Sequence, residues 1–184
     1  MDLFGQDAHW KILSCFFRVP EREMYVREIS PLSEVSVGSA SLMCRRLSEA
    51  GLLKQKKLGN SVFYSLDNRN PLIRRLKSAW FLQQLLRFRA DWEREDFVSV
   101  ALYGSYSSGE FISKSDIDIL VIANCEEEPV DGALKRAKEE FQAEINHVRF
   151  TVGKWRELAR RGERFYTEVL SNHLLLWGSS LVMG

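Results

Sequence analysis

The chain is poor in cysteine and contains no long hydrophobic run. Its three cysteines, Cys15, Cys44 and Cys125, are widely spaced among 184 residues and match neither a pairing pattern nor a metal-binding pattern. This excludes a disulfide framework and predicts a protein of the reducing cytoplasm. No apolar segment approaches the length of a membrane span, and the first residues lack the basic-then-apolar pattern of a secretory signal. A membrane partner is therefore not expected.

The small net charge of the whole chain conceals an asymmetry between its two halves. Residues 1–95 hold sixteen Lys and Arg against eleven Asp and Glu, a net charge of +5, whereas residues 96–184 hold ten against fourteen, a net charge of −4. With 45% hydrophobic and 28% charged residues, the composition is that of an ordinary globular protein. A basic half beside an acidic half predicts two domains with different partners, and a polyanion is expected at the basic half.

The most informative segment lies in the acidic half. The apolar run 97–103 predicts a strand that ends at a Gly104-Ser105 turn, and a second run, 117–122, predicts another strand. Asp116 and Asp118 are two residues apart at the start of the second run, so their side chains point to the same face. Two adjacent carboxylates repel each other unless a cation lies between them, and hard oxygen ligands of this kind suit Mg²⁺ or Mn²⁺.

The Gly104-Ser105 turn adds a second element to this site. Its backbone N–H groups are suited to bind phosphate oxygens. An Asp-Ile-Asp sequence alone is also typical of a solvated strand end. The turn, which precedes the carboxylates by ten residues and lies between two strand-like runs, instead favours a metal-dependent site for a nucleoside triphosphate.

This pattern, Gly104-Ser105 followed by Asp116-Ile117-Asp118, resembles the signature of the polymerase-β-like nucleotidyltransferase superfamily, and most closely its small prokaryotic members. The resemblance covers about residues 96–184. It implies a mixed sheet flanked by helices and an NTP substrate, ATP in the expected case, bound through divalent metal ions. It assigns Asp116 and Asp118 to metal binding and catalysis, and Gly104, Ser105 and Ser115 to nucleotide binding.

The resemblance also implies a third carboxylate from a later strand, and Glu144 in the segment 143–150 is the best match. In a two-metal scheme, Glu144 would complete the metal shell and help to deprotonate an acceptor hydroxyl. An exposed strand-end residue is the alternative interpretation. The chain departs from the family pattern at Ser107-Ser108-Gly109, where Ala-Arg-Gly is common. Ser108 cannot supply the bidentate bonds of a guanidinium, which lowers the catalytic power that we expect.

The basic half predicts three helices followed by a β-hairpin. The expected helices cover residues 8–19, 25–29 and 37–50, the last with Ser36 as its N-cap and Gly51 after its end. Strand-like segments, 52–55 and 62–66, flank a Leu58-Gly59-Asn60-Ser61 turn. This order, together with the string Arg46-Leu47-Ser48-Glu49-Ala50-Gly51-Leu52-Leu53, resembles the winged helix-turn-helix domain of transcription regulators over about residues 5–70.

In such domains the third helix enters the major groove of DNA and the wing contacts the backbone or the minor groove. The resemblance therefore makes DNA an expected partner. The candidate DNA-binding residues are Ser39, Ser41, Arg45 and Arg46 in the third helix and Lys54, Lys56, Lys57 and Asn60 in the wing. Leu42 and Met43 occupy positions where a DNA reader usually carries polar side chains, so a protein-binding or dimerising winged helix is the alternative.

Residues 72–92, after the Asn70-Pro71 break, predict one long helix that is too apolar for a flexible linker. It is expected to pack the domains together or to pair with its copy in a homodimer, since paired winged helices read paired half-sites. Further helices are expected over 132–142, 154–161 and 163–170, after an acidic loop at 126–129. The expected organisation is an α+β chain with a winged helix-turn-helix domain (1–70), a connecting helix (71–95) and a nucleotidyltransferase domain (96–184).

Three functions are compatible with these patterns. The first is a DNA-binding regulator whose nucleotidyltransferase domain transfers AMP from ATP to a hydroxyl. Small family members act as antitoxins that modify a HEPN-type toxin, so a tyrosine of such a partner is the expected acceptor, and an aminoglycoside is a second possibility. The second function is a transcription regulator whose transferase-like domain is inactive and only binds nucleotide or mediates assembly. The third is a non-enzymatic module in which both domains bind proteins.

Overall fold

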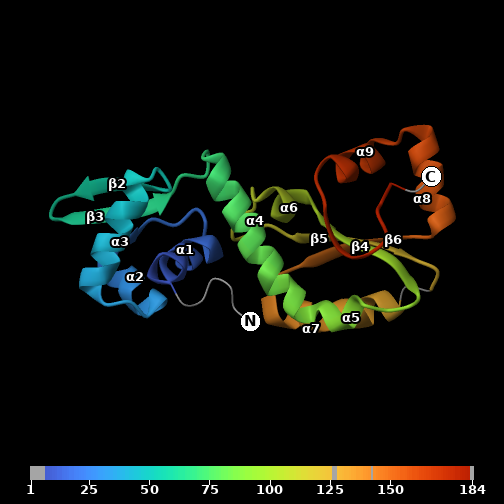
Figure 1. Ribbon diagram of the computed structural model, residues 1–184, viewed down its shortest axis with the longest axis horizontal. Coiled ribbons are helices and arrows are strands. Elements are labelled where there is room, and N and C mark those ends of the chain that lie inside the picture. Colours follow the sequence, from blue (N-terminus) through green and yellow to red (C-terminus); the bar gives the residue numbers. More distant parts are fainter. Residues whose placement is uncertain (1–6, 126–127, 142, 183–184) are drawn as a thin grey trace. The chain divides into compact units, whose positions relative to one another are not determined.

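The computed structural model describes residues 7–125, 128–141 and 143–182 (Figure 1). The chain divides into two compact units. Unit 1 holds the residues up to Trp80 together with the short segment Gly109–Ser113, and unit 2 holds Phe81–Ser108 and the residues from Lys114 onward. The chain therefore leaves unit 2 after Ser108, contributes five residues to unit 1, and returns at Lys114.

Unit 1 contains three helices followed by a β-hairpin, in the order that the sequence predicts. Its elements are α1 (Ala8–Arg18), β1 (Met24–Tyr25), α2 (Val26–Ser33), α3 (Val37–Glu49), β2 (Leu53–Leu58), β3 (Ser61–Leu66) and the first part of α4 (Pro71–Leu85). Strands β2 and β3 are antiparallel, and the short β1 pairs with the other edge of β3. Assignment of this unit to the winged helix-turn-helix class stays a prediction.

The apolar faces of the three helices enclose the core of unit 1. In α3, Ala40, Cys44 and Leu47 are buried at helical spacing, and they join buried residues of α1 in one cluster. The predicted ends of α3 are also confirmed. The Ser36 hydroxyl accepts a hydrogen bond from the backbone N–H of Ser39 at 3.3 Å, and Gly51, with a φ of 70°, follows the last turn.

The second helix differs from its prediction, because it starts one residue later and continues through Pro31. Its start is set by Glu28, whose carboxylate accepts the backbone N–H of Tyr25 at 3.0 Å. Tyr25 itself belongs to β1, where it lies opposite Phe63 of β3. The helix ends at Glu34, which adopts the left-handed conformation with a φ of 55°. Pro31 and Ser33, residues typical of a turn after the expected second helix, both lie within this helix in the structure.

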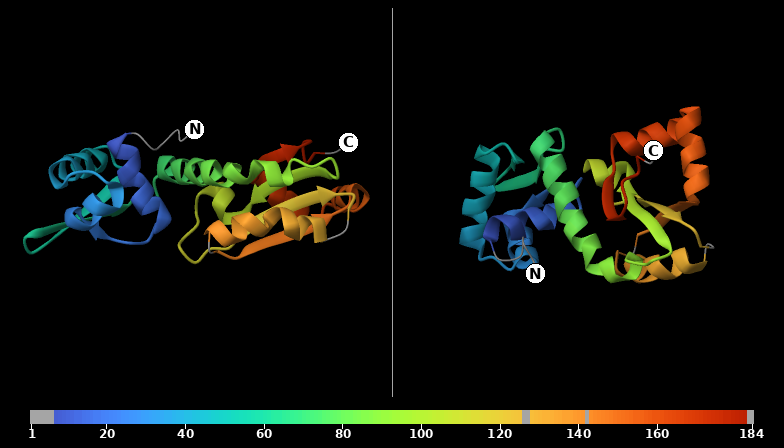
Figure 2. Two further views of the ribbon diagram at one scale, coloured as in Figure 1. Left: turned by 90° about the horizontal axis from the view of Figure 1, so that it is seen from below. Right: turned by 45° about the vertical axis from the view of Figure 1, so that its right-hand side comes forward.

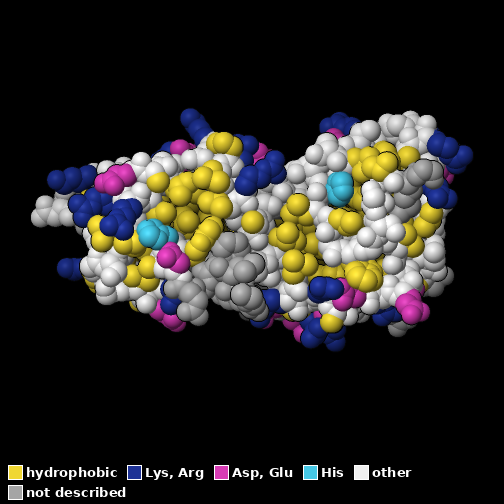
Figure 3. All heavy atoms as spheres, in the orientation of Figure 1, with side chains coloured by type: hydrophobic (Ala, Val, Ile, Leu, Met, Phe, Trp, Pro, Cys, Tyr) yellow, Lys and Arg dark blue, Asp and Glu magenta, His cyan; other side chains and the backbone are white. Residues whose placement is uncertain are grey.

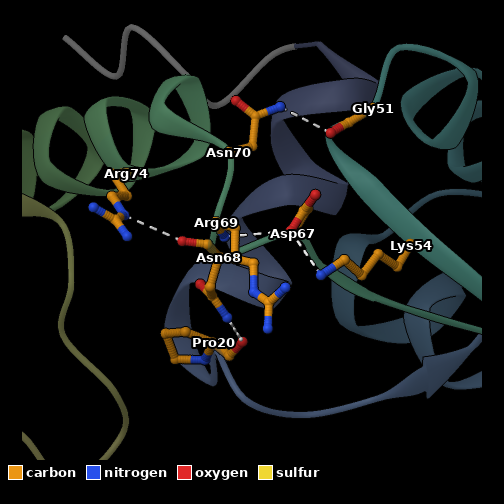
Figure 4. Close-up of polar contacts among 8 residues, drawn as sticks. All are labelled: Pro20, Gly51, Lys54, Asp67, Asn68, Arg69, Asn70 and Arg74. Carbon is orange, nitrogen blue, oxygen red and sulfur yellow. Dashed lines mark hydrogen bonds and ion pairs between the residues drawn. The ribbon is translucent and has the colours of Figure 1, made fainter.

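The connection from the hairpin to α4 is held by amide side chains that bond to earlier backbone groups (Figure 4). Asn68 donates to the carbonyl of Pro20 at 3.0 Å, and Asn70 donates to the carbonyl of Gly51 at 2.9 Å. The side-chain oxygen of Asn70 also accepts the backbone N–H of Leu72 at 2.9 Å. These bonds end the hairpin and start α4 at the break that the Asn70-Pro71 sequence predicts.

Unit 2 is built on a four-stranded mixed sheet flanked by helices (Figures 1 and 2). Its elements are the end of α4, the 3₁₀ turn η1 (Leu86–Phe88), α5 (Arg89–Trp92), β4 (Phe97–Tyr103), α6 (Gly104–Ser108), β5 (Ile117–Ala123), α7 (Glu128–Phe141), β6 (Ile145–Phe150), α8 (Val152–Arg161), α9 (Arg164–Ser171) and β7 (Leu174–Gly178). The strand order is β6-β5-β4-β7, and only β5 and β6 are parallel. The predicted α+β class with a mixed sheet is confirmed.

Helices cover both faces of this sheet, so its central strands are buried on both sides. On one face, buried residues of the strands join residues of α8, α9 and the following C-terminal segment in one cluster: Ala101, Leu120, Ile122, Trp155, Val169 and Leu181. The alternating residues of β4 and β5 that point to the other face are also fully buried. In β5 only Asp118 is not buried, which singles out this residue for a role other than packing.

The long helix predicted over 72–92 is interrupted, because α4 ends at Leu85 and a 3₁₀ turn leads into α5. The rings of Phe81 and Phe88 lie 5.2 and 5.7 Å from that of Phe141 in α7, and Trp92 is completely buried. Packing against α7 thus overrides the helical propensity of the sequence.

Among the described residues, no helix is long and apolar enough to cross a membrane.

The start of α7 also differs from its prediction. Glu128 and Pro129, expected in an acidic loop, belong to the first turn of this helix, where proline is tolerated. Residues 126–127 of that loop, and Gln142 at the predicted end of the helix, lie outside the described residues. Strand β7 was not predicted, because an apolar run after α9 does not by itself distinguish a strand from a helix.

Unit 1 contains one buried lysine. Lys77 of α4 is 2% exposed, and its Nζ donates to the carbonyl of Phe111 at 2.8 Å and to Oδ1 of Asn68 at 3.3 Å. The same Nζ lies 4.5 Å from the centre of the Phe111 ring. Burial lowers the pKa of Lys77 to about 8, since desolvation disfavours the charged form.

This pKa predicts a pH dependence of stability that replacing Lys77 removes. Below about pH 8, Lys77 carries its proton in both the folded and the unfolded state, so its contribution to the free energy of unfolding does not change with pH. Between about pH 8 and 10.5 the unfolded chain keeps a proton that the folded state has released, so the free energy of unfolding rises with pH. We expect the free energy of unfolding of the wild type, minus that of Lys77→Met, to increase in urea titrations from pH 8 to pH 9.5. A flat difference would contradict the assigned pKa.

Candidate functional site

Asp116 and Asp118 lie at the start of β5, where the register of the sheet places them beside the end of β4. Asp118 is directly opposite Tyr103 in the antiparallel β4–β5 pair and level with Asn146 in the parallel β5–β6 pair. Asp118 is half-buried, and Asp116, one residue before the strand, is exposed. The chain turns into α6 at Gly104, directly after Tyr103 (Figure 1). The carboxylate pair and the Gly-Ser turn therefore meet at one end of two neighbouring strands.

The absence of a side chain at Gly104 makes room for Asp118. Gly104 has a φ of 69°, in the left-handed region that favours glycine. A Cβ atom at this position would overlap Oδ2 of Asp118. The sequence predicts glycine here for a phosphate-binding turn. The structure adds a second reason, because glycine leaves space for the Asp118 carboxylate.

The site concentrates negative charge in a partly buried place. Burial raises the pKa of Asp118, and the charge of Asp116 raises it further. Burial and the charge of Asp118 raise the pKa of Tyr103 to about 12, and burial with the charge of Asp116 raises that of Tyr106. Within the described part of the chain, neither aspartate forms an ion pair. A cation bound at the pair would relieve this repulsion.

Asn146 is a member of the site that the sequence interpretation missed. Its Nδ2 donates to Oδ2 of Asp116 at 3.1 Å, across the parallel β5–β6 pair. Glu144, taken from the resemblance, lies one residue before β6. Asn146, two positions later, is on the same side by strand alternation, and this alternation could have pointed to it. Glu144 is exposed just before β6, and its backbone carbonyl accepts the N–H of Ile117 at 2.9 Å.

The hydroxyl groups of α6 are largely used within the fold. The hydroxyl of buried Ser107 donates to the carbonyl of Gly104 at 2.8 Å and lies 2.9 Å from the carbonyl of Asn172. Ser108 donates to the carbonyl of Ser105 at 3.1 Å. These bonds shape the turn in which Ser105 is half-buried.

The remaining predicted nucleotide-binding residue, Ser115, directly precedes the carboxylate pair. It is half-buried, and its carbonyl accepts the hydroxyl of Tyr106 at 3.5 Å. The structure therefore places Gly104, Ser105 and Ser115 in the two segments that flank the aspartates. Their contact with a nucleotide stays a prediction.

The donor set suits a divalent cation that shares its ligands with a substrate. Mg²⁺ in phosphate-handling sites commonly takes one or two carboxylates and completes its shell with phosphate oxygens and water. Asp118 lies over Gly104, and Asp116 is near enough for its charge to raise the pKa of Asp118, so the two carboxylates supply such a pair. Among the residues that the structure describes, no group of three or more His, Cys, Asp or Glu side chains is placed to hold a metal. Glu144 is thus not gathered with the pair, and its role as a third ligand stays a prediction.

A comparison with protein-family models adds independent information about this segment. Residues 83–165 match the nucleotidyltransferase domain family. The matched segment contains the Gly104 turn, Asp116, Asp118 and Asn146, and it covers less than half of the chain. It agrees with the nucleotidyltransferase resemblance of this half of the sequence. A comparison with curated proteins gives no match.

Solved structures similar to the chain include a toxin–antitoxin complex with AMP-PNP, at 20% identity and a TM-score of 0.39, covering 54% of this chain and 74% of that one. Another is a complex of tri-AMPylated HEPN toxin with MNT antitoxin from Shewanella oneidensis, at 17% identity and a TM-score of 0.34, covering 55% and 73%. A possible transcriptional regulator from Methanosarcina mazei Go1 matches at 18% identity and a TM-score of 0.33, covering 48% and 80%. Likeness at this level carries no information about function.

Outside the nucleotidyltransferase segment, all side chains predicted to bind DNA are exposed in unit 1: Ser39, Ser41, Arg45, Arg46, Lys54, Lys56, Lys57 and Asn60. Figure 3 shows Lys and Arg side chains gathered over the end of this unit that carries the β2–β3 hairpin. Lys54 pairs with Asp67 at 2.7 Å, and Lys56 lies 4.0 Å from Glu23. Arg45, Arg46 and Lys57 form no ion pair with any described residue.

The exposed surface of α3 also has an apolar part. Leu42 is 38% exposed and Val37 is 50% exposed, whereas Met43 packs against the core of unit 1. The hydroxyl of Ser39 accepts a hydrogen bond from that of Ser36 at the start of the helix. The cations of α3 are therefore confined to its C-terminal half, and the apolar start keeps the protein-binding alternative open.

The role of Gly104 in seating Asp118 is testable without any ligand. We expect Gly104→Ala to turn the Asp118 carboxylate away from its half-buried position, so that the pKa of Asp118 falls towards its ordinary value. Carboxyl-carbon NMR titration measures this directly. Because the overlapping atom is the end of a side chain, the loss of stability should be only about 1 kcal/mol, the cost of alanine at a positive φ.

Gly162→Ala is the matched control for this experiment. Gly162 has a φ of 63°, and a Cβ atom there would meet nothing within 4 Å. It should lose a similar amount of stability in urea unfolding and leave the pKa of Asp118 unchanged. An equal pKa of Asp118 in both variants would disprove the seating role of Gly104.

Proposed function

We propose that unit 2 is a metal-dependent nucleotidyltransferase that transfers a nucleoside monophosphate from an NTP to a hydroxyl group. The observation that carries this proposal is the close approach of Asp118 to Gly104 beside Asp116, within the segment that matches the nucleotidyltransferase domain. Catalysis of phosphoryl chemistry depends mainly on positioning and on neutralising charge. A carboxylate pair next to a backbone turn serves both requirements.

Each residue of the site has a distinct proposed role. Asp116 and Asp118 hold Mg²⁺ or Mn²⁺, which when bound neutralises the triphosphate and polarises the phosphate that is attacked. The backbone N–H groups of the turn at Gly104 and Ser105 bind phosphate oxygens, and Ser115 lies beside them. Asn146 orients the carboxylate of Asp116 through its hydrogen bond.

The proposed reaction begins with an acceptor hydroxyl close to the carboxylates. Glu144, exposed before β6, is the proposed base that takes the hydroxyl proton, and the hydroxyl oxygen then attacks the α-phosphate. One P–O bond forms as the bond to pyrophosphate breaks. We propose ATP as the donor and AMP as the transferred group. The resemblance of the Gly104 to Asp118 signature to small antitoxin members of the family supports a tyrosine of a HEPN-type toxin as the acceptor.

The carboxylate pair is tested by neutralising it. We expect Asp116→Asn and Asp118→Asn each to weaken binding of ATP with Mg²⁺ at least about tenfold in calorimetry, and the double variant to abolish label transfer from α-³²P-ATP. Asp118→Asn should be at least as stable as the wild type, because folding already disfavours the charge of this buried carboxylate. The defect is then one of ligand binding and not of folding.

Two further variants sharpen this test. Asp131→Asn removes an exposed carboxylate of α7 that pairs with Lys138 at 3.7 Å, and it should bind ATP as the wild type does. Glu144→Gln should slow label transfer with little change in ATP binding if it acts as the base. A wild type that binds no ATP with Mg²⁺ would overturn the transferase proposal.

For unit 1 we propose a winged helix-turn-helix domain (residues 1–70) that binds DNA. One observation supports this proposal. Three exposed cations of α3 and the wing form no ion pair with any described residue, namely Arg45, Arg46 and Lys57. The apolar helical segment 71–95 is proposed to support a homodimer, so that two copies of α3 read paired half-sites. The nucleotidyltransferase domain then occupies residues 96–184.

DNA binding by unit 1 is tested by removing these three cations. We expect the triple variant Arg45→Gln, Arg46→Gln, Lys57→Gln to bind duplex DNA at least about tenfold more weakly in fluorescence anisotropy. The slope of log affinity against log salt should decrease by about 1 for each lost phosphate contact.

The control for the DNA experiment makes the same change in charge within unit 2. Lys154→Gln, Arg161→Gln and Arg164→Gln replace three exposed cations that pair with Glu157 or Glu168. This variant should retain the affinity and salt slope of the wild type. Equal losses in both triple variants would mean that DNA binding is a property of net charge and not of unit 1.

The alternative function, a regulator with an inactive transferase-like domain, is favoured by one observation. Ser108 stands where the family commonly carries arginine, and its hydroxyl bonds to the carbonyl of Ser105. Binding of ATP with Mg²⁺ that depends on Asp116 and Asp118, without label transfer to any acceptor, would decide for this alternative.

A further inference from the structure

The loop that joins the two halves of the nucleotide site is anchored in unit 1. Residues 109–115 connect α6, which ends at Ser108, to Asp116. Of these, Gly109–Ser113 belong to unit 1, and only Lys114 and Ser115 separate them from the first aspartate. Each trans peptide spans 3.8 Å between Cα atoms, so this connection has little slack. A shift of residue 113 must therefore be passed on to Asp116 or absorbed by two residues.

The start of the loop touches the backbone of α4. Gly109 has a φ of 75°, and a Cβ atom at this position would overlap the backbone carbonyl of Arg74. The side chain of Arg74 pairs with Glu110 at 2.8 Å, but both are about half exposed, so this ion pair adds little. Glycine thus permits the contact, and another interaction must hold the loop in place.

The middle of the loop is held by Lys77. Phe111 is 3% exposed, and Lys77 donates a hydrogen bond to its carbonyl at 2.8 Å while its Nζ faces the aromatic ring. A charged donor in a buried place makes a stronger bond than a surface pair. At the end of the loop, the N–H of Ser113 donates to the exposed carboxylate of Glu21 at 3.2 Å. Lys77 is therefore a buried polar anchor of this loop.

We propose that Lys77 is a positioning residue for the nucleotide site: by holding the carbonyl of Phe111 it fixes the loop from which the chain enters Asp116 and Asp118. Lys77 touches neither aspartate and takes no part in the chemistry. Its role links the fold of unit 1 to the geometry of the carboxylate pair in unit 2 through the covalent chain. The effect on metal binding rests on the proposed function of the site. The effect on the loop rests only on the contacts of Lys77 in the structure.

The first readout needs no ligand. In Lys77→Met, which keeps the length of the side chain and removes the donor, we expect faster backbone amide hydrogen exchange at residues 109–113 and also at 114–118. Lys77→Arg keeps a charged donor and should restore most of the protection. Unchanged exchange at 114–118 in Lys77→Met would overturn the proposal, whatever happens to binding.

The second readout is Mn²⁺ binding, followed by electron paramagnetic resonance with Mn²⁺ alone. Loss of a group that orients a metal ligand commonly costs about 10- to 100-fold in affinity, and we expect a weakening in this range for Lys77→Met. Wild-type affinity in a variant whose loop exchanges faster would also overturn the positioning role.

Two controls separate positioning from general destabilisation. Ile29→Ala removes buried side-chain volume from the core of unit 1 without touching the loop. It should leave both the hydrogen exchange of residues 114–118 and the Mn²⁺ affinity unchanged. Arg74→Gln removes the exposed pair with Glu110 and an exposed hydrogen bond to the carbonyl of Asn68, and it should have a small effect on either readout. If the wild type itself bound no Mn²⁺, the proposed metal site would fail, and the exchange data would still decide the claim about the loop.

Discussion

The close approach of the Asp118 carboxylate to the backbone of Gly104 constrains the rest of unit 2. It requires β4 and β5 to pair so that Tyr103 lies opposite Asp118, and it requires the chain to turn at residue 104 with a positive φ. Burial of the central strands between two layers of helices fixes this register, because a slip by one residue would turn every side chain towards the opposite layer of helices. The packing of an apolar sheet thus supports a partly buried, negatively charged site.

The site also depends on residues beyond the two strands, β4 and β5, that carry it. Asn146 comes from a third strand and bonds to Asp116, and Tyr106 of α6 bonds to the carbonyl of Ser115. The loop between these elements is anchored by Lys77, a residue that lies in the basic half of the sequence. Burying this lysine opposes folding of unit 1, yet its hydrogen bonds to Phe111 and Asn68 satisfy the amino group. The buried position of Lys77 is therefore explained by its role in holding the loop through the carbonyl of Phe111.

Sequence patterns performed well where the signal is local. The strands around Gly104 and Asp116 and the N-cap Ser36 of α3 follow from apolar alternation, turn chemistry and capping, all of which act within a few residues. The same reasoning failed for the predicted helix over 72–92, since contacts of Phe88 with Phe141 interrupt it, and for β7, whose apolar sequence suits either kind of element. It also preferred Glu144, which lies just before β6, to Asn146 within this strand.

The sequence by itself determined the pair Asp116 and Asp118, the glycine turn before it and the division of charge between two halves, because these depend on residue type and short spacing. Only the tertiary structure decided that Asp118 occupies the space above Gly104, that Asn146 bonds to Asp116, and that Phe111 packs with Lys77. Each of these contacts joins segments whose approach is set by strand register and helix packing. Those are properties of the whole folded chain, and no local pattern encodes them.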